Sequence, residues 1–600
     1  MASSAMIQFQ SHNSTAVHVP SPLHMASSSS TALRRLCFQL PFRRLPPVPS
    51  LRLTSVVRIR AFSTHGTGSE ISVTGEKVTN KPPICTADEL HYVSVKNSDW
   101  KLALWRYHPS PQAKPRNHPL LLLSGVGTNA IGYDLSPEFS FARYMCEQGF
   151  DTWILEVRGA GLSVQGSNPK EIEQSAHAIS DQMEAVAVSG AEKVLSTSQS
   201  SASNESSPKE TGVAMINQDP TGPTTEREDA VLVTKLTETF IILSDRVSGF
   251  LSEGQSRIIS AKLFDQFSKL VADSFLAERF DEIRKNLLSL LEVRQNSAVA
   301  SQIRDLSQKL IGIIEEGQRT VSPPLFDLQE RLSTTIEDFQ KQLDLIVKYD
   351  WDFDHYLEED VPAAMEYIKA HTKPKDGKLL AIGHSMGGIL LYSMLSRLGS
   401  EGKEPGFAAI VTLASSLDYR SSESSLKLLI PLADPAQALN VPIVPLGALL
   451  TAAYPLTSRP PYVLSWLNHM ISAQDMMHPD LLKKLVLNNF CTIPAKLLLQ
   501  LASAFREGGL CDRSGVFFYK DHIHKINIPV LAVAGDQDAI CPPEAVQDTV
   551  KLIPENLVTY KVFGKAGGPH YAHYDLVGGR LVVDEVYPCV VQFLSHHDKM

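Results

Sequence analysis

The fold is constrained most by residues 378–391, which read KLLAIGHSMGGILL. The short apolar run predicts a buried strand, the Gly-x-Ser-x-Gly pattern predicts a sharp turn, and the apolar continuation predicts the start of a helix. Gly383 and Gly387 suit a turn too tight for neighbouring side chains, which would lift the Ser385 hydroxyl into a cleft at the sheet edge. The amides at the start of the helix would stabilise negative charge there. The segment predicts a nucleophilic serine, and an ordinary structural turn is the alternative.

The composition is that of a globular protein. The chain has 600 residues, of which 43% are hydrophobic and 20% are charged. This length exceeds a single compact core, so we expect one large domain with insertions, or two to three domains. No run of about eighteen apolar residues occurs, so no membrane-spanning helix is expected. The net charge of -9 argues against a nucleic-acid-binding protein, which would carry a basic face.

The cysteine and histidine patterns do not indicate a metal site. Seven cysteines are scattered along the chain without a Cys-x-x-Cys pair, a pattern typical of free thiols in a reducing compartment. The stretch Asp521-His522-Ile523-His524 contains metal-ligand residue types, but no second cluster lies near it in the sequence. We therefore expect a polar loop at this place, and neither a metal nor a cofactor.

The N-terminal segment has the composition of a targeting sequence. Residues 1–60 contain no Asp or Glu, many Ser, and arginine without lysine. This is typical of an organelle transit peptide, and the apolar stretch of a secretory signal is missing. The opening Met-Ala-Ser-Ser and residues 57–61 resemble plant chloroplast presequences, so we expect a chloroplast location, with the mitochondrion as the alternative. Without this segment the chain would be more acidic, so binding to an anionic membrane would need a local basic patch.

Residues 61–88 are predicted to be an N-terminal linker, and residues 89–167 the first part of a sheet-containing core. Alternating apolar positions on both sides of Asn97-Ser98-Asp99 predict a hairpin over 89–108. The order strand, helix, strand that follows implies a parallel sheet. These further elements are a strand buried on both faces over 118–123, a helix over 139–149 and a strand over 152–157.

A glycine-rich loop, residues 124–129, follows the strand over 118–123. Such a loop leaves backbone N–H groups open for an anion. We assign the amides of Val126 and Met386 as the two donors of an oxyanion hole. A plain strand-to-loop turn is the alternative.

The sheet pattern is interrupted between residues 168 and 346. Residues 168–228 are rich in Ser, Thr, Glu, Asn, Gln and Pro and are expected to form a disordered linker, because they cannot bury enough apolar surface to fold. Residues 229–346 have apolar positions at helical spacing and predict a helical insertion. A bundle that buries its own apolar stripes fits this pattern, and so does a lid, a membrane-surface module or a partner-binding module.

The sheet pattern resumes over residues 347–419, which contain the Ser385 turn, a predicted helix over 359–368 and a predicted strand over 407–416. Residues 420–527 are predicted to be largely helical and are unusually apolar. A cap over the serine would lie here, and its apolar lining would favour a lipophilic acyl or alcohol group. Ordinary core helices are the alternative.

Residues 528–600 complete the predicted core and begin with a strand that ends in Gly535-Asp536-Gln537-Asp538. A carboxylate at the C-terminal end of a strand can reach a histidine, hold its tautomer and stabilise its charged form. Asp538 is the preferred residue for this role, and Asp536 is the alternative.

Two histidines, His570 and His573, follow a predicted strand over 558–563. Either could act as the base beside the serine. The chain order serine, aspartate, histidine is the one that a strand, turn and helix of this type imposes.

Several of these segments together resemble the α/β-hydrolase superfamily, and within it the acid-lipase branch. In that branch the catalytic histidine begins a His-x-Asp sequence, which is why His573 is preferred over His570. The layout is also similar to that of chloroplast-directed plant hydrolase-like proteins. Ser124-Gly125 departs from the His-Gly of the family, and the helical insertion is not part of the family pattern. The segments that carry the resemblance are 383–387, 359–363, 529–538 and 571–576.

The resemblance implies an α/β-hydrolase fold, a mostly parallel sheet with helices on both faces, carrying a long helical insertion and a helical cap. It implies a serine hydrolase that cleaves carboxylic esters, of lipophilic or lipid substrates, with Ser385 as nucleophile, His573 as base and Asp538 as the orienting acid, without a cofactor. Acyl transfer to an alcohol is a second reading, and a non-catalytic scaffold or lipid-binding protein is a third. An acyl ester or lipid is the expected partner, with peripheral membrane contact through the cap or the insertion; the oligomeric state is not predicted.

Overall fold

The structure is a computed structural model. The predicted transit peptide over 1–60 lies outside the described residues, and so does most of the predicted linker and helical insertion. The described residues within 168–346 are all helical. The structure describes residues 75–78, 80–166, 174, 176–179, 334, 338, 341, 344–346, 348–429, 442–458 and 464–599.

One large sheet forms the centre of the described part of the chain, with the strand order β1-β2-β3-β7-β4-β9-β10-β13-β14 and with β8 paired to β3. The strands from β7 to β14 are parallel to one another, whereas β1, β2 and β3 pair antiparallel. The bounds are β1 (Gly75–Lys77), β2 (Glu89–Ser94), β3 (Trp100–Tyr107), β4 (Leu120–Leu123), β7 (Thr152–Leu155), β8 (Val164–Gln165), β9 (Leu379–His384), β10 (Phe407–Leu413), β13 (Val530–Gly535) and β14 (Val558–Phe563).

The sheet confirms the predicted hairpin and the predicted parallel strands. The strands β4, β9 and β13 are buried along their whole length, as continuous apolar runs in a parallel sheet should be. The strand β14 has the predicted bounds. The structure also adds β1, an exposed edge strand, within the segment that the sequence indicated as a linker.

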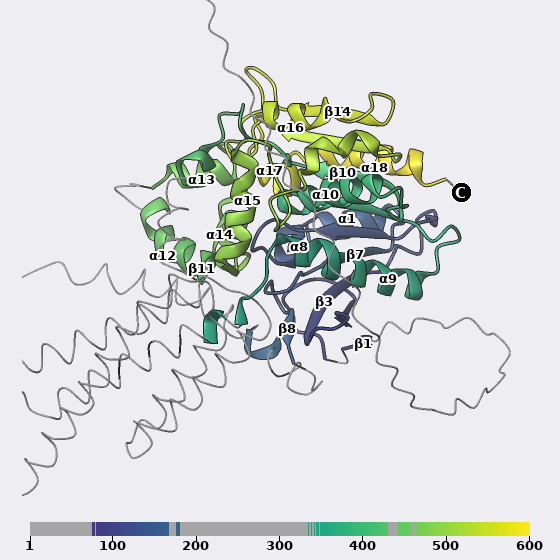
Figure 1. The fold of residues 1–600 in the computed structure, drawn as a ribbon, viewed down its shortest axis with the longest axis horizontal. Helices are drawn as coiled ribbons and strands as arrows, with labels where there is room; N and C mark the ends of the chain where they lie inside the picture. The colour runs from purple at the N-terminus through teal and green to yellow at the C-terminus, as the bar shows by residue number, and fades with distance from the viewer. Residues whose placement is uncertain are drawn as a thin grey trace, which may run out of the picture. The chain divides into compact units, whose positions relative to one another are not determined.

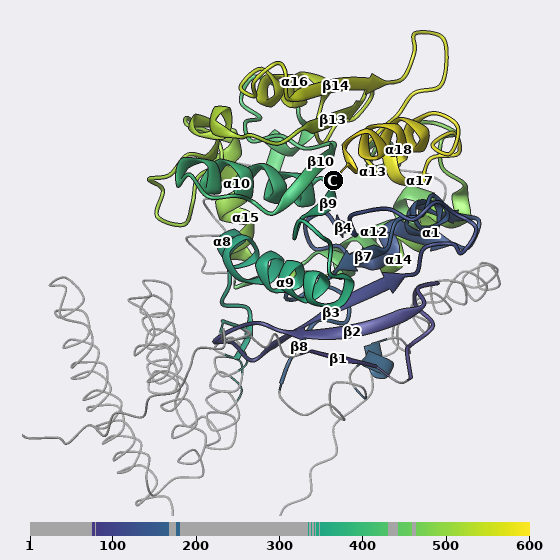
Figure 2. The ribbon, with the colours of Figure 1, turned by 90° about the vertical axis from the view of Figure 1, so that its right-hand side faces the viewer.

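Helices cover both faces of the sheet (Figure 2). The helices α1 (Phe141–Glu147) and α18 (Val586–His597) lie on one face. The helices α9 (Val361–Thr372), α10 (Met386–Ser400) and α16 (Pro543–Val550) lie on the other. The predicted helix before the serine is α9, with Pro362 in its first turn, where its missing N–H costs nothing.

The chain reverses direction across the sheet at β4. This strand lies between β7 and β9 although it precedes both in the sequence. The next strand of the sheet, β7, is added on the side of β3, and the later strands β9, β10, β13 and β14 are added on the other side. The carboxyl ends of the strands beside such a reversal leave a crevice in which open α/β sheets bind ligands. The loops after β4, β9, β13 and β14 therefore converge on the position where a functional site is expected.

The segment predicted to form a cap is not helical throughout. It contains a two-stranded antiparallel pair, β11 with β12, which breaks the apolar stretch over 481–501 into two helices. Pro494 ends the second strand and precedes α15. The cap helices gather on one side of the sheet (Figure 1). Their bounds are α12 (Leu446–Ser458), α13 (Trp466–Ile471), α14 (Pro479–Asn488) and α15 (Ala495–Ala502), and the strands are β11 (Ile443–Pro445) and β12 (Thr492–Pro494).

Short elements complete the fold. The π-helical turn Tyr356–Asp360 joins α8 to α9. The other short elements are η1 (Ala130–Tyr133), β5 (Asp134–Ser136), β6 (Phe139–Ser140), α8 (Phe353–His355), η3 (Ser425–Leu429), η4 (Ser503–Phe505), η5 (Tyr519–Asp521), η6 (Ile523–Lys525) and α17 (Asp575–Gly578). Within the described ranges, no helix has both the length and the apolar character required to cross a bilayer.

The ends of the 168–346 excursion meet at one residue of the core. Gln165, in β8 just before the excursion, pairs with Trp100 of β3. Trp351, just after the excursion, places its ring centroid 5.2 Å from that of the same tryptophan. The chain therefore leaves the core and returns to it at the same place.

Candidate active site

Ser385 occupies the predicted turn between β9 and α10. Its backbone has φ of 55° and ψ of -119°, a conformation that costs a residue with a side chain about 1–3 kcal/mol and persists only where the surroundings enforce it. The surroundings do so through backbone hydrogen bonds: the Ser385 amide donates to the Leu413 carbonyl over 2.9 Å, and the Ser385 carbonyl accepts from Ile389. The serine therefore projects from a strained, fixed turn.

The glycines on either side of Ser385 are required by space. A Cβ on Gly383 would lie 2.3 Å from the carbonyl carbon of Gly387, and a Cβ on Gly387 would lie 2.1 Å from the carbonyl oxygen of Leu123. Contacts this short would force the backbone apart. The turn therefore packs directly against the end of β4, and it leaves no room for side chains at the two glycines, as the sequence predicted.

The glycine-rich loop after β4 passes beside the serine. A Cβ on Gly125 would lie 3.4 Å from Cβ and 3.8 Å from Oγ of Ser385. Within the described residues, the amides of Val126 and Met386 donate to no acceptor. The Met386 amide also begins α10, where the helix dipole favours negative charge. Both predicted donor amides are thus free to bind an oxyanion next to the serine, one in the loop after β4 and the other at the start of α10.

Asp538 and His573 form a buried pair in the loops after β13 and β14. His573 Nδ1 lies 2.8 Å from Asp538 Oδ2, and their side chains are 3% and 0% exposed. The other carboxylate oxygen, Oδ1, accepts the amides of Ile540 and Cys541 over 2.9 and 2.8 Å. Because two amides hold one oxygen, the other is fixed toward the imidazole, and a carboxylate there requires Nδ1 to carry its proton.

His384, the residue before the serine, holds the backbone of His573. Its Nε2–H donates to the His573 carbonyl over 2.9 Å, and the two rings lie 4.7 Å apart. Burial lowers the pKa of His384 to about 3, with a smaller contribution from His573. His384 therefore stays neutral and brings the candidate base against the turn that carries Ser385.

The contact between nucleophile and base is not closed in this arrangement. Within the described part of the chain, no hydrogen bond joins the Ser385 hydroxyl to the His573 ring. Catalytic hydrogen bonds often tighten only when substrate is bound. The imidazole is therefore oriented by Asp538, and its contact with the Ser385 hydroxyl is not formed in this arrangement.

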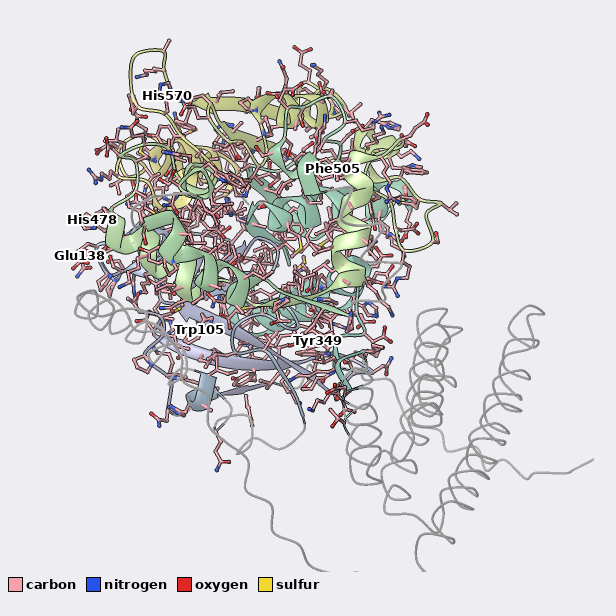
Figure 3. The ribbon with its side chains drawn as sticks, turned by 90° about the vertical axis from the view of Figure 1, so that its left-hand side faces the viewer. Trp105, Glu138, Tyr349, His478, Phe505 and His570 are labelled. Atoms are coloured by element: carbon pink, nitrogen blue, oxygen red, sulfur yellow. The ribbon has the colours of Figure 1, made fainter. Side chains whose placement is uncertain are left out.

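The alternative acid and the alternative base pair with each other. His570 Nδ1 contacts Asp536 Oδ2 over 2.5 Å, and the Tyr571 amide donates to Asp536 Oδ1. The His570 side chain is 34% exposed, against 3% for His573, and lies on the loop after β14 (Figure 3). The structure thus separates the candidates into an inner pair, Asp538 with His573, and an outer pair, Asp536 with His570.

Comparisons with known proteins find similarity only among solved structures. No family model and no curated protein matches the chain. A monoacylglycerol lipase of Paleococcus ferrophilus matches with 17% identity, over 40% of this chain and 76% of its own, at a TM-score of 0.27. A soluble variant of monoglyceride lipase from Saccharomyces cerevisiae matches with 11% identity, over 84% and 96%, at 0.35. The enol-lactonase of Burkholderia xenovorans matches with 10% identity, over 84% and 99%, at 0.30.

These scores are low, so the strand order and the turn at Ser385 carry the assignment of the fold. The chain has the α/β-hydrolase fold. The predicted fold class is therefore confirmed. In an α/β-hydrolase fold, the nucleophile follows a central strand and the acid and base follow later strands. Ser385, Asp538 and His573 stand at those positions after β9, β13 and β14.

Asp575 is a site residue that the sequence analysis quoted without assigning it a role. Its carboxylate is fully buried and accepts the amide of Ala572, which precedes His573, over 2.7 Å. It also accepts the Ser472 hydroxyl over 2.6 Å and the Ala473 amide over 2.7 Å, both from the cap. Burial raises the pKa of Asp575 to about 6. The signal available in the sequence was an acidic residue two positions after a histidine.

Glu156 is a second buried carboxylate that the sequence analysis did not single out. It lies at the end of β7 and accepts the amides of Ala130 and Leu162 over 2.9 and 2.8 Å. Burial raises the pKa of Glu156 to about 7. Gly161 has no room for a Cβ against this carboxylate. Glu156 therefore braces the loops after β4 and β7, and a glutamate at the end of a buried strand is the sequence signal.

The stretch that could have suggested a metal site is a surface turn. Asp521 ends η5, His524 lies in η6 and His522 lies between the two turns, where its ring stacks on Phe517 at 4.4 Å. Among the described residues, no group of three or more His, Cys, Asp and Glu side chains is placed to hold a metal ion.

Proposed function

We propose that the protein is a serine hydrolase that cleaves carboxylic esters of lipophilic substrates through an acyl-enzyme. The observation that carries this proposal is the buried Asp538–His573 pair, held by His384 against the strained turn of Ser385. A strained serine, an imidazole of fixed tautomer and free backbone amides are together the requirements of acyl transfer.

In the first half of the reaction, His573 Nε2 takes the proton of Ser385 while Oγ bonds to the ester carbonyl carbon. The carbonyl electron pair moves to oxygen, and the amides of Val126 and Met386 donate to that oxyanion. The tetrahedral intermediate then collapses, the bond from carbon to the alcohol oxygen breaks, and His573 gives the proton to the departing alcohol. Asp538 stabilises the imidazolium in between.

In the second half, a water molecule attacks the acyl group on Ser385. His573 takes the proton of the water, and the same amides hold the second oxyanion. When this intermediate collapses, Ser385 takes the proton back and the carboxylic acid leaves. No residue outside the set already named is needed for either step.

The apolar character of the cap supports a lipophilic substrate. A Cβ on Gly127, in the loop that holds Val126, would lie 2.6 Å from Cγ2 of Ile493 and 3.7 Å from Cδ2 of Leu446. Both side chains belong to the cap. The acyl or alcohol group of a bound ester would thus lie along these apolar side chains. The apolar surface buried there would contribute about 25 cal/mol per Å² to the free energy of binding.

The direct test is labelling of the folded protein with a fluorophosphonate, followed by mass spectrometry of its peptides. We expect a single adduct on Ser385. Absence of an adduct in correctly folded protein would favour the non-catalytic reading, and an adduct on another serine would contradict the assigned site. Product analysis in the presence of a competing alcohol then separates hydrolysis from acyl transfer, since a transferase would form a new ester.

The proposal includes contact of the cap with a lipid surface. The helix α12 contains no charged residue, and Leu449, Leu456 and Trp466 of α12 and α13 are each about half exposed, at 54%, 49% and 51%. An uncharged helix with exposed leucines beside a tryptophan suits a bilayer interface. Leu446, the first residue of α12, lies beside Gly127 of the loop next to the serine, so the proposed route of a lipid runs from α12 to this loop.

Replacing the three exposed cap residues, Leu449, Leu456 and Trp466, by serine should weaken binding to phosphatidylcholine vesicles about tenfold or more, because each loses its apolar transfer free energy. Flotation of the full chain with vesicles measures this. The matched control replaces Leu552, Val562 and Val583, exposed apolar residues outside the cap, by serine and should bind like wild type. Equal binding by the cap variant would contradict the proposed contact.

The proposed location is the chloroplast, supported by the acid-free, arginine-containing composition of residues 1–60. The full chain carrying a fluorescent protein at its C-terminus should enter chloroplasts and be shortened there, whereas a chain that starts at residue 61 should remain outside. Fluorescence in mitochondria would favour the alternative location, and fluorescence in neither organelle would contradict both.

A further inference from the structure

The cap is hydrogen-bonded to the loop that carries the candidate oxyanion donor. The Asn129 amide donates to the Asn489 carbonyl over 3.0 Å, and the Cys491 amide donates to the Gly127 carbonyl over 2.7 Å. Thr128 and Phe490 between them form an antiparallel bridge. The loop after β4 and the cap segment 489–491, which follows α14, are thus a short piece of sheet. The position of the Val126 amide depends on where the cap sits.

The same cap segment is hydrogen-bonded to the loop that carries the base. The Asn489 side chain donates through Nδ2 to the Tyr574 hydroxyl over 3.0 Å, and Tyr574 directly follows His573. Asn489 is fully buried and Tyr574 is 6% exposed. The Tyr574 ring lies 4.8 Å from that of His384 and 5.9 Å from that of His573. One residue of the cap therefore contacts both sides of the candidate site, the loop after β4 through its carbonyl and the base loop through its side chain.

Further bonds fix the base loop to the cap backbone. The Tyr574 amide donates to the carbonyl of Ile471, at the end of α13, over 2.8 Å. The Asp575 carboxylate joins the Ala572 amide to Ser472 and Ala473 of the cap. The base loop is thus held along the residues on both sides of His573. In this geometry the cap connects the loop of the base to the loop of the oxyanion hole.

We infer that Asn489 and Tyr574 are positioning residues that couple the oxyanion loop to the His573 loop through the cap. This inference rests on the proposed hydrolase function and extends it. The Asn489–Tyr574 bond keeps the Val126 amide and the His573 imidazole in register, so that oxyanion stabilisation and proton transfer act on the same carbonyl. Positional errors of about 1 Å in such a set can cost about a hundredfold in rate.

The test is Tyr574→Phe, which removes the hydroxyl and keeps the ring. We expect kcat for a soluble p-nitrophenyl ester to fall about tenfold, which corresponds to the typical energy of one buried hydrogen bond, with KM within about twofold because no group that binds the ground state is lost. Binding of a trifluoromethyl ketone, which forms the oxyanion, should weaken by the same factor as kcat. Binding of the corresponding alcohol, which cannot form it, should not change.

A double variant separates positioning from general destabilisation. Asn489→Leu combined with Tyr574→Phe removes both partners, so no buried donor is left unpaired and stability should return toward that of wild type. We expect its kcat to remain as low as that of Tyr574→Phe alone, because the coupling bond is still absent. Recovery of kcat together with stability would contradict the inference and reduce the pair to ordinary packing.

The matched control is Tyr92→Phe, which removes a buried hydroxyl that donates to the Leu162 carbonyl over 3.2 Å from β2. Its kcat should stay within about twofold of wild type. If wild type turns over esters and Tyr574→Phe equals it in kcat and in ketone binding, the coupling is wrong and the hydrolase function stands. If wild type shows neither turnover nor labelling at Ser385, the proposed function itself has failed.

Discussion

Ser385→Ala should lower kcat for a p-nitrophenyl ester about a millionfold, the loss typical of a triad serine. Without Oγ no acyl-enzyme forms, so the imidazole has no proton to move and the free amides no oxyanion to hold. Fluorophosphonate labelling should disappear in the same variant. Stopped-flow measurement of the acylation burst, compared between the two proteins, gives the loss directly. Substrate binding should be retained because the cap is unchanged.

A matched control for Ser385→Ala is Ser393→Ala in the same helix α10. The Ser393 hydroxyl is buried and makes no hydrogen bond within the described part of the chain, so its removal should leave both stability and turnover close to those of wild type. Turnover by Ser385→Ala within about tenfold of wild type would rule out the acyl-enzyme mechanism, since a residual rate from binding and oxyanion contacts alone is far smaller.

Asp538→Asn should lower kcat about ten-thousandfold while the protein keeps its fold. The amides of Ile540 and Cys541 hold one oxygen of the residue at position 538, so the new amide nitrogen must face His573. It can only donate, which turns Nδ1 into an acceptor and moves the proton of the ring to Nε2. The imidazole then carries its proton on the nitrogen that faces Ser385 and cannot act as base. Steady-state kinetics measure the loss.

The outer pair provides the control for this prediction. Asp536 contacts His570 as Asp538 contacts His573, with one oxygen on a backbone amide and the other on Nδ1. Asp536→Asn should therefore cost no more than about tenfold, through a small shift of the loop that both histidines share. A larger loss in Asp536→Asn than in Asp538→Asn would assign the acid to the outer pair instead.

The residues that the sequence predicted best are those whose role follows from their neighbours in the chain. A serine between two glycines after a buried apolar run admits few backbone paths, and Ser385 adopts the expected strained turn. The strand β14 has the predicted bounds, and Asp538 and His573 form the preferred pair. The turn and the strands followed from local pattern, whereas the choice of His573 over His570 followed from the resemblance to the acid-lipase branch.

The connections between the cap and the core could not be predicted in this way. Asn489 and Tyr574 are 85 positions apart, and nothing in the residues beside either one indicates the other. The apolar stretch over 481–501 belongs to the segment, 420–527, that the sequence predicts to be largely helical. Pairing of β12 with β11 and of Cys491 with Gly127 overrides that local preference, since tertiary hydrogen bonds replace the helical ones. The sequence feature that could have indicated these connections was a polar residue in an otherwise apolar segment.

The contacts of Gln165 and Trp351 with Trp100 mark where the 168–346 excursion leaves the core and where it returns. An insertion that leaves and rejoins the core at neighbouring points does not strain the core, whatever its length. Such sites tolerate inserted segments. Both ends contact Trp100 at the start of β3, which lies toward the edge of the sheet where β7 and β9 end. Exchange of the sequence between these two points should therefore leave the arrangement of Ser385, Asp538 and His573 unchanged.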